Sequence, residues 1–301
     1  MINGVSHSDP AKVKVNNSIE IVYDTFGKTS GPPILLIMGL GEQMISWDEE
    51  FCAELANRGY WVIRFDNRDI GLSTKLDEAG IPDIPTLIQA LMLGGGIQPP
   101  YTLGNMAEDA VGLLDALGIE TAHVVGISMG GMIAQEMAIN FPKRLRTLTS
   151  IMSSTENPKL PPPKPEAMSI LVTPFPMDRE GYLEYSIQTS RVLNGPVFPV
   201  DAARVTERAS KFFDRGLCLM GTARQLAAVL GSDCRQERLQ SVTVPSLVIH
   251  GDADPLVPVE CGIETANSIP GAELLIIQGM GHDLPLAVVP QVIEAIVRHA
   301  V

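Results

Sequence analysis

The sequence has few of the features that mark a metal-binding, disulfide-stapled or cofactor-dependent protein. Its four cysteines, Cys52, Cys218, Cys234 and Cys261, include no CxxC pair, so the spacing of a metal site is missing. A chain of 301 residues also needs no disulfides to complete its core. We therefore predict neither a metal nor a cofactor, and we expect reduced, mostly packed thiols in a cytoplasmic protein.

Long apolar runs and an excess of positive charge are missing as well. The longest apolar stretches have the length of core strands, far short of a bilayer span, and the polar start does not resemble a secretory signal. The formal net charge is −13, and such a surface repels nucleic-acid phosphates and anionic lipid headgroups. We therefore expect no nucleic-acid partner and no membrane insertion. The sequence leaves the oligomeric state undetermined.

The chain is rich in apolar residues, which make up 45% of it. They occur in short β-rich runs that alternate with helical patterns, as is typical of an α/β fold with a mainly parallel sheet flanked by helices. The predicted strands are Ile19–Tyr23, Pro33–Ile37, Tyr60–Phe65, Ala122–Val125, Leu145–Ile151, Pro245–His250 and Ala272–Ile277. The predicted helices are Trp47–Arg58, Asn105–Leu117, Met129–Asn140, Pro258–Ser268 and Pro285–Ala300.

One region, residues 153–240, breaks this alternation because it contains no strand pattern. It opens with a proline cluster, Pro158, Pro161–Pro163 and Pro165, which excludes interior helix and central strand there. Long structureless loops are rare in compact domains. We therefore predict a helical cap at residues 153–240, inserted into a core domain formed by residues 1–152 and 241–301. The helix-like segments of this cap are Glu180–Leu193, Asp201–Arg215 and Gly221–Leu230.

The segment Gly126-Ile127-Ser128-Met129-Gly130 joins an apolar run to a helical pattern. In a G-x-S-x-G pattern, small residues at both ends allow a sharp strand-to-helix turn that holds the serine out above the sheet. The hydroxyl group then lies at the positive end of the following helix. A bare match of this pattern is weak, but the strand–turn–helix context predicts that Ser128 is a nucleophile rather than a helix N-cap.

A serine nucleophile needs a base, and His282 is the best placed of the five histidines. It lies in a glycine-containing loop just past the last predicted strand, and this loop can fold back over the carboxyl edge of the sheet. Two aspartates after the preceding strand, Asp252 and Asp254, can orient its imidazole. Pro255 favours Asp254, because it biases that residue towards an extended conformation and helps to hold the loop still. Asp252 is more typical of a turn residue that caps local backbone amides.

Acyl transfer also requires hydrogen-bond donors for the oxyanion of the tetrahedral intermediate. We expect one of them to be the backbone N–H of Met129, directly after the nucleophile. The other should come from the loop Met38–Gly41 that follows the strand Pro33–Ile37, and we predict the N–H of Leu40. Only backbone groups are used, so a plain glycine turn is compatible with this prediction.

Four segments together resemble the α/β-hydrolase superfamily: Asp66–Ser73, Gly126–Gly130, His250–Pro258 and Gly279–His282. The resemblance covers nearly the whole chain outside the predicted cap. It is strongest for the branch that holds aclacinomycin methylesterase-like enzymes and small bacterial carboxylesterases. The chain departs from the family at Met38-Gly39, where many members have His-Gly before the oxyanion residue. This change does not remove the backbone N–H donor.

The resemblance implies the α/β-hydrolase fold and a role for each matching residue. Ser128 corresponds to the nucleophile, Asp254 to the acid and His282 to the base, with Leu40 and Met129 as oxyanion donors.

The function that we predict is a serine carboxylesterase that hydrolyses short- to medium-chain esters of small molecules through an acyl-serine intermediate. Alternatives within the fold are a perhydrolase, a carbon–carbon hydrolase and an iminopeptidase, which would need cap acids such as Glu180, Glu184 and Glu207 to hold an amine. An alternative of another class is a receptor-like ligand-binding protein that retains the triad. Dehalogenases and epoxide hydrolases are disfavoured, because both use an aspartate where this chain has Ser128.

Overall fold

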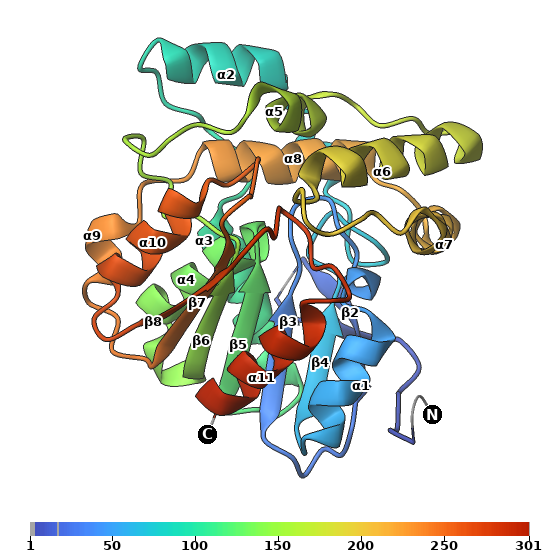
Figure 1. The fold of residues 1–301 in the computed structure, drawn as a ribbon, viewed down its shortest axis with the longest axis vertical. Coiled ribbons are helices and arrows are strands. Elements are labelled where there is room, and N and C mark those ends of the chain that lie inside the picture. The colour runs from blue at the N-terminus through green and yellow to red at the C-terminus, as the bar shows by residue number, and fades with distance from the viewer. Residues whose placement is uncertain (1–3, 17, 301) are drawn as a thin grey trace.

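The computed structural model describes residues 4–16 and 18–300, and it has helices on both faces of a central sheet (Figure 1). Over these residues the sheet has eight strands in the order β1-β2-β4-β3-β5-β6-β7-β8. The pairs β1–β2 and β2–β4 are antiparallel, and all pairs from β4 across to β8 are parallel. The sheet is therefore mainly parallel, as predicted. The strands are β1 (Ala11–Lys14), β2 (Glu20–Phe26), β3 (Pro33–Ile37), β4 (Trp61–Phe65), β5 (Ala122–Ile127), β6 (Leu145–Ile151), β7 (Ser246–Gly251) and β8 (Glu273–Ile277).

Most helices fall into those that cover the sheet and those that lie between β6 and β7. The first group is α1 (Glu49–Asn57), α3 (Leu103–Ala116), α4 (Met129–Asn140), α10 (Val259–Ser268) and α11 (Val289–His299). Helix α2 (Ile84–Met92), between β4 and β5 in the chain, belongs to neither group. The second group is α5 (Pro165–Val172), α6 (Arg179–Leu193), α7 (Ala202–Arg215), α8 (Leu219–Leu230) and α9 (Gln236–Leu239). Short 3-10 turns lie at Met44–Ser46, Asp77–Ala79 and Pro142–Arg144.

Strand β3 shows how one strand serves two cores. Its residues are all buried, and successive side chains point to opposite faces of the sheet. Ile34 and Leu36 join the cluster that contains residues of α1 and α11, whereas Leu35 and Ile37 join the cluster that contains residues of α3 and α4. Figure 1 shows α1 and α11 in front of the sheet and α3 and α4 behind it. A strand buried on both faces explains the continuous apolar runs in the sequence.

Helices α5, α6 and α8 lie above the end of the sheet towards which the parallel strands run, and α2 lies above them (Figure 1). The chain therefore leaves the sheet after β6 and returns to it at β7. Within residues 4–16 and 18–300, no helix is long and apolar enough to cross a membrane.

Four strands and α-helices of the structure were not predicted: β1, α2, α5 and α9. The prediction excluded interior helix from the whole proline cluster, yet α5 begins at its last member, Pro165. Proline at the first helical position is tolerated because its missing N–H has no partner there in any helix. Helix α11 begins at Val289 rather than at Pro285.

Buried ion pairs connect the helices after β6 with the charged loop after β4. Arg224 of α8 is fully buried and donates to both carboxylate oxygens of Asp69, at 2.9 and 2.7 Å. Arg215 at the end of α7 donates to the buried Asp66 at 2.5 Å. Removing one partner of such a pair would leave the other charged and buried, which is strongly unfavourable. These pairs therefore hold α7 and α8 against the sheet domain.

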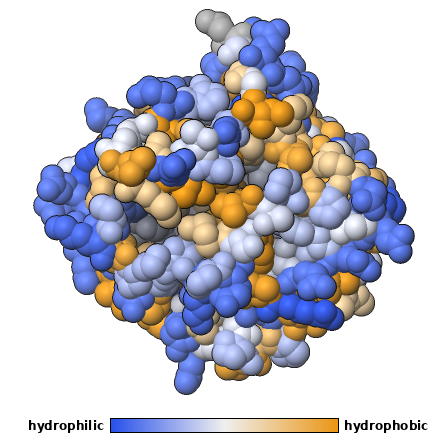
Figure 2. Space-filling view, turned by 90° about the horizontal axis from the view of Figure 1, so that it is seen from above, coloured by the Kyte–Doolittle hydropathy of each residue, from blue (hydrophilic) through white to orange (hydrophobic). Residues whose placement is uncertain are grey.

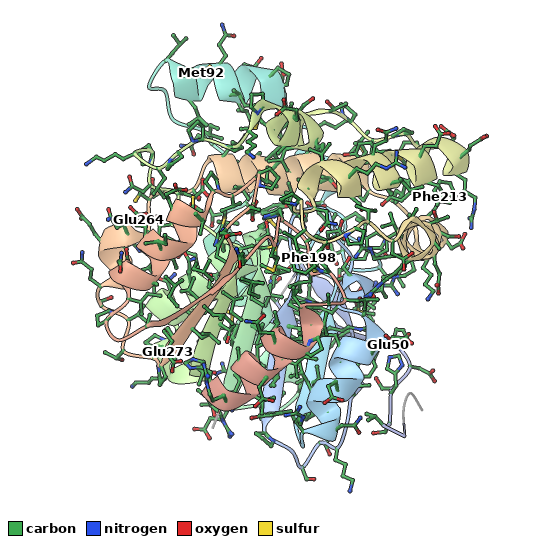
Figure 3. All side chains as sticks on the ribbon, viewed as in Figure 1. Glu50, Met92, Phe198, Phe213, Glu264 and Glu273 are labelled. Carbon is green, nitrogen blue, oxygen red and sulfur yellow. The ribbon has the colours of Figure 1, made fainter. Side chains whose placement is uncertain are left out.

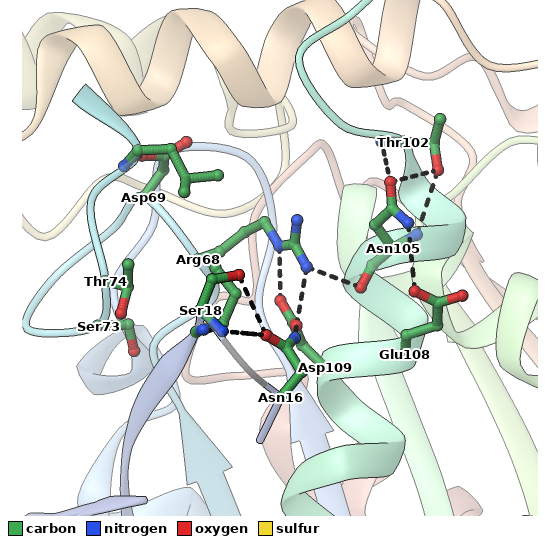
Figure 4. A network of polar contacts seen from close by, with 12 residues as sticks. Asn16, Ser18, Arg68, Asp69, Ser73, Thr74, Thr102, Asn105, Glu108 and Asp109 are labelled. Atoms are coloured by element: carbon green, nitrogen blue, oxygen red, sulfur yellow. Dashed lines mark hydrogen bonds and ion pairs between the residues drawn. The ribbon is translucent and has the colours of Figure 1, made fainter. Parts of the chain in front are cut away.

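A second network attaches the same loop to α3 (Figure 4). Arg68 donates to both carboxylate oxygens of Asp109, at 2.6 and 2.8 Å, and to the carbonyl oxygen of Asn105 at 3.1 Å. Asn16 donates to Asp109 from the other side at 2.9 Å. Thr102 caps the start of α3 by accepting from the backbone N–H of Asn105. The loop after β4 is therefore hydrogen-bonded from two sides.

Candidate active site

Ser128 lies at the turn between β5 and α4 in a conformation that few L-residues adopt, with φ 54° and ψ −122°. Its backbone N–H donates to the carbonyl oxygen of Ile151 at 2.9 Å, which fixes the turn to the end of β6. The flanking glycines are required by contact. A Cβ atom on Gly126 would lie 2.0 Å from the carbonyl oxygen of Gly130, and one on Gly130 would lie 2.2 Å from that of Ile37.

The three residues that the sequence singles out form one chain of hydrogen bonds. Nε2 of His282 lies 2.9 Å from Oγ of Ser128, and Nδ1 of His282 lies 2.7 Å from Oδ2 of Asp254. A carboxylate only accepts, so Nδ1 carries the proton and the neutral ring accepts from the serine hydroxyl through Nε2. The side chain of Asp254 is fully buried, and that of His282 is 8% exposed. The arrangement is able to take a proton from Ser128 and to stabilise the imidazolium that results.

The loop of Asp254 is itself held by hydrogen bonds. The second carboxylate oxygen of Asp254 accepts from the backbone N–H groups of Leu256 and Val257, at 2.9 and 2.8 Å. The buried His250 contacts the carbonyl oxygen of Val257 through Nε2 at 2.8 Å. Burial lowers the pKa of His250, so its ring is neutral and donates this hydrogen bond. The loop of Asp254, which we expected Pro255 to hold still, is therefore also held by a network of side chains and backbone amides.

Asp252 has a different position from the one predicted. Its carboxylate accepts from the backbone N–H of Gly279 at 2.6 Å, so it caps an amide of the histidine loop rather than one of its own turn. Both aspartates thus face the segment Gly279–His282. Only Asp254 contacts the imidazole of His282.

The two predicted oxyanion donors come from segments that meet beside Ser128. Gly39 approaches Ser128 so closely that a Cβ atom there would lie 3.3 Å from the serine Cβ. Asn67 holds this loop by donating to the carbonyl oxygen of Met38 at 3.0 Å. Among the residues that the structure describes, the N–H groups of Leu40 and Met129 form no hydrogen bond. They are therefore available to an oxygen atom that approaches Ser128.

Ser128 and His282 open into a cavity of about 540 Å³ between the sheet and the helices above it. Most of its walls are apolar, and its lining comes from the loop after β3, the start of α2, and α5, α6 and α8. Figure 2 shows apolar side chains across the middle of the upper face of the molecule, with polar side chains towards its rim. Lining residues include Leu40, Ile81, Ile84, Leu171, Phe175, Tyr182, Leu193, Arg208, Met220 and Leu226. In the described part of the chain, no group of three or more His, Cys, Asp or Glu side chains is arranged to hold a metal ion.

A family model described as the alpha/beta hydrolase fold matches residues 32–286. The chain belongs to this family. A relative of this α/β hydrolase is the rhodomycin D methylesterase of Streptomyces peucetius, with 31% identity over 96% of this chain and 98% of that protein. Another is the 2-hydroxy-6-oxononadienedioate/2-hydroxy-6-oxononatrienedioate hydrolase of Paraburkholderia phymatum, with 32% identity over 94% of this chain and 93% of that protein.

Solved structures resemble this α/β hydrolase in fold. The enol-lactonase of Burkholderia xenovorans LB400 superposes with a TM-score of 0.71 at 21% identity, covering 97% of this chain and 99% of that one. A hydrolase of Pseudomonas aeruginosa PA01 gives a TM-score of 0.69 at 24% identity, covering 97% and 98%. These similarities support the fold and carry no information about the substrate.

Several cavity residues of this α/β hydrolase were missed at the level of sequence. The segment Ile81–Pro85 lines the cavity. It could have been found, because Asp83 followed by Pro85 is a helix start signal and Asp83 does cap α2. By contrast, no sequence pattern distinguishes Arg208 from its exposed neighbours on α7.

Proposed function

We propose that this α/β hydrolase cleaves carboxylic esters of small molecules, with Ser128 as the nucleophile. The observation that carries the proposal is the continuous hydrogen-bonded order Ser128–His282–Asp254 at the wall of a cavity. The similarity to enzymes named methylesterases, at 31% identity over nearly the full chain, supports an ester as the substrate.

The reaction would proceed in two steps. His282 takes the proton of Ser128 as Oγ attacks the ester carbonyl, and the N–H groups of Leu40 and Met129 stabilise the oxyanion. The imidazolium then gives its proton to the leaving alcohol, so that an acyl-serine remains. Water, deprotonated by His282, hydrolyses the acyl-serine and releases the acid. Asp254 keeps the proton of the ring on Nδ1 throughout.

Residues 153–240 would act as a cap that sets the size of the substrate. Helices α5, α6 and α8 supply a large part of the cavity wall, and the volume of about 540 Å³ suits a small molecule. We therefore propose short- to medium-chain acyl groups. Long-chain triglyceride droplets would need an open site instead.

Two alternatives differ in their support. A relative named 2-hydroxy-6-oxononadienedioate/2-hydroxy-6-oxononatrienedioate hydrolase, at 32% identity, and one named 3-oxoadipate enol-lactonase, at 29%, keep a carbon–carbon hydrolase and a lactonase as second candidates. The iminopeptidase hypothesis loses its predicted amine holders, because Glu180, Glu184 and Glu207 are exposed and do not line the cavity.

The test is hydrolysis of p-nitrophenyl esters from acetate to palmitate, alongside a lactone and an amino-acyl amide. We expect the highest kcat/KM on acetate to octanoate and little turnover of the amide. A serine-directed phosphonate should label the protein at Ser128, as mapped by peptide mass spectrometry.

The Ser128→Ala variant is the matched control, because alanine fits the turn and the fold should be retained by circular dichroism. It should lose both hydrolysis and labelling. Labelling at another serine, or hydrolysis by Ser128→Ala, would refute the proposed nucleophile. Ligand binding without hydrolysis of any ester by the wild type would favour the receptor-like alternative.

A further inference from the structure

Three arginines of α7, Arg204, Arg208 and Arg215, lie on one side of the helix, because their spacing of four and seven residues returns to the same face. Arg204 pairs with Asp48, and Arg215 pairs with Asp66 at 2.5 Å. Arg208 lies between them and lines the cavity that contains Ser128. Among the described residues it has neither a hydrogen bond nor an ion pair.

Two carboxylates lie near Arg208 without pairing with it. Asp283 and Glu42 also line the cavity, and each already has a partner: Asp283 accepts from the backbone N–H of Leu284 at 2.8 Å, and Glu42 accepts from Ser46. Burial lowers the pKa of Arg208, but the attraction of Asp283 and Glu42 outweighs this effect and raises it. Arg208 therefore keeps its charge and presents unused N–H donors to the cavity.

The donors of Arg208 are not sealed off from solvent while the cavity is open, but a substrate that fills the cavity without offering an acceptor would leave them unsatisfied, which is costly. The rest of the cavity wall is mostly apolar, so an apolar substrate would leave these donors unpaired. A substrate with an oxygen atom near Arg208 would satisfy them. The two pairs on either side, Arg204–Asp48 and Arg215–Asp66, hold the helix and so fix the position of Arg208.

We propose that Arg208 is a specificity-determining residue that donates hydrogen bonds to a second, uncharged oxygen of the substrate, such as a ketone or a further ester carbonyl. An uncharged acceptor is favoured over a carboxylate because Asp283 and Glu42 already balance the guanidinium and would repel another anion. This inference rests on the proposed ester hydrolysis and adds the chemical class of the acid portion.

The experiment compares methyl hexanoate with its 3-oxo, 4-oxo and 5-oxo derivatives, which differ only in a ketone at successive positions. For the wild type we expect the best oxo ester to exceed methyl hexanoate in kcat/KM by about tenfold or more, as one or two hydrogen bonds to a charged donor would give. In Arg208→Met this ratio should fall towards one, and Arg208→Lys should keep part of it. Monomethyl adipate, which carries a carboxylate, should not exceed the best oxo ester.

The matched control is Lys211→Met, on the same helix but with an exposed side chain outside the cavity lining, which should leave the ratio unchanged. The proposal is wrong if Arg208→Met keeps the ratio of kcat/KM between the best oxo ester and methyl hexanoate. An equal fall in kcat/KM for both kinds of ester would be such a result. Preference for monomethyl adipate would overturn the uncharged acceptor.

Failure of the proposed function is distinguishable from failure of this inference. If the wild type hydrolyses none of these esters, the same set is titrated calorimetrically into Ser128→Ala and into Ser128→Ala/Arg208→Met. Tighter binding of an oxo ester that the second substitution removes would support the role of Arg208. Equal binding to both proteins would refute it.

Discussion

The backbone N–H of His282 donates a hydrogen bond to the carbonyl oxygen of Leu193, at 2.7 Å. Leu193 is the last residue of α6, so the proposed base is held from the proposed cap as well as by Asp254. The segment after α6 also approaches the histidine loop closely, because a Cβ atom on Gly195 would lie 1.9 Å from the carbonyl oxygen of Gly279. Phe198, a few residues further on, lies between the helices that follow β6 and the strands (Figure 3).

Substitution of Gly195 by alanine should therefore displace the histidine loop. We expect kcat on p-nitrophenyl acetate to fall by roughly 10- to 100-fold, because a small misplacement of a catalytic group is costly. Gly104→Ala is the control, since a Cβ atom there meets only Thr102, at 3.4 Å. Circular dichroism and thermal melting would report whether the fold is kept. A folded Gly195→Ala protein with wild-type kcat would show that the loop is held without the cap.

Asp254 and Asp252 should differ sharply when each is changed to asparagine. Asp254→Asn disturbs the tautomer of His282, and the precedent of serine proteases gives a loss of kcat on the order of 10⁴. Asp252→Asn keeps an acceptor for the N–H of Gly279, so we expect a loss of less than tenfold. Steady-state kinetics on one ester decides this. A larger loss for Asp252→Asn would reverse the roles proposed for the two residues.

The sequence was sufficient to predict the parallel strands and the three residues that meet at the site, because each of these residues follows an apolar run. Ser128 and Asp254 follow the fully buried strands β5 and β7, whereas His282 follows β8, whose side chains are mostly exposed. Strand β1 was missed although its apolar residues alternate with Lys12 and Lys14, because the strand is only four residues long and all of it except Val13 is exposed. The contact of His282 with Leu193 could not be predicted, since it joins backbone atoms of segments whose distance depends on the packing of the cap. The isolation of Arg208 depends in the same way on which acids lie opposite α7.

Removing one partner of the buried pair Arg224–Asp69 should destabilise the fold far more than removing one partner of an exposed pair does. Arg224→Met leaves the carboxylate of Asp69 buried and unpaired, which should lower the free energy of unfolding by about 3–5 kcal/mol. Lys12→Met breaks the Lys12–Glu20 pair, whose side chains are about half exposed, and should cost less than about 1 kcal/mol. Urea denaturation of both variants measures the difference. Equal effects would contradict the role of burial.

His123 should make the stability depend on pH. Its side chain is buried, and its Nδ1 lies 2.9 Å from Oγ1 of Thr147. Burial lowers the pKa of His123 to about 4. In the unfolded chain the reference pKa is about 6.5, so between pH 6.5 and pH 4 the unfolded state binds a proton that the folded state does not. The resulting stability is fully present above pH 6.5 and is lost as the pH falls towards 4. We expect about 2 kcal/mol of it to disappear between pH 7 and pH 5.

The His123→Asn variant lacks this titration, so the difference in unfolding free energy between wild type and variant, measured in urea, should shift by that amount. A difference that stays constant over this range would mean that His123 titrates alike in the folded and unfolded chains.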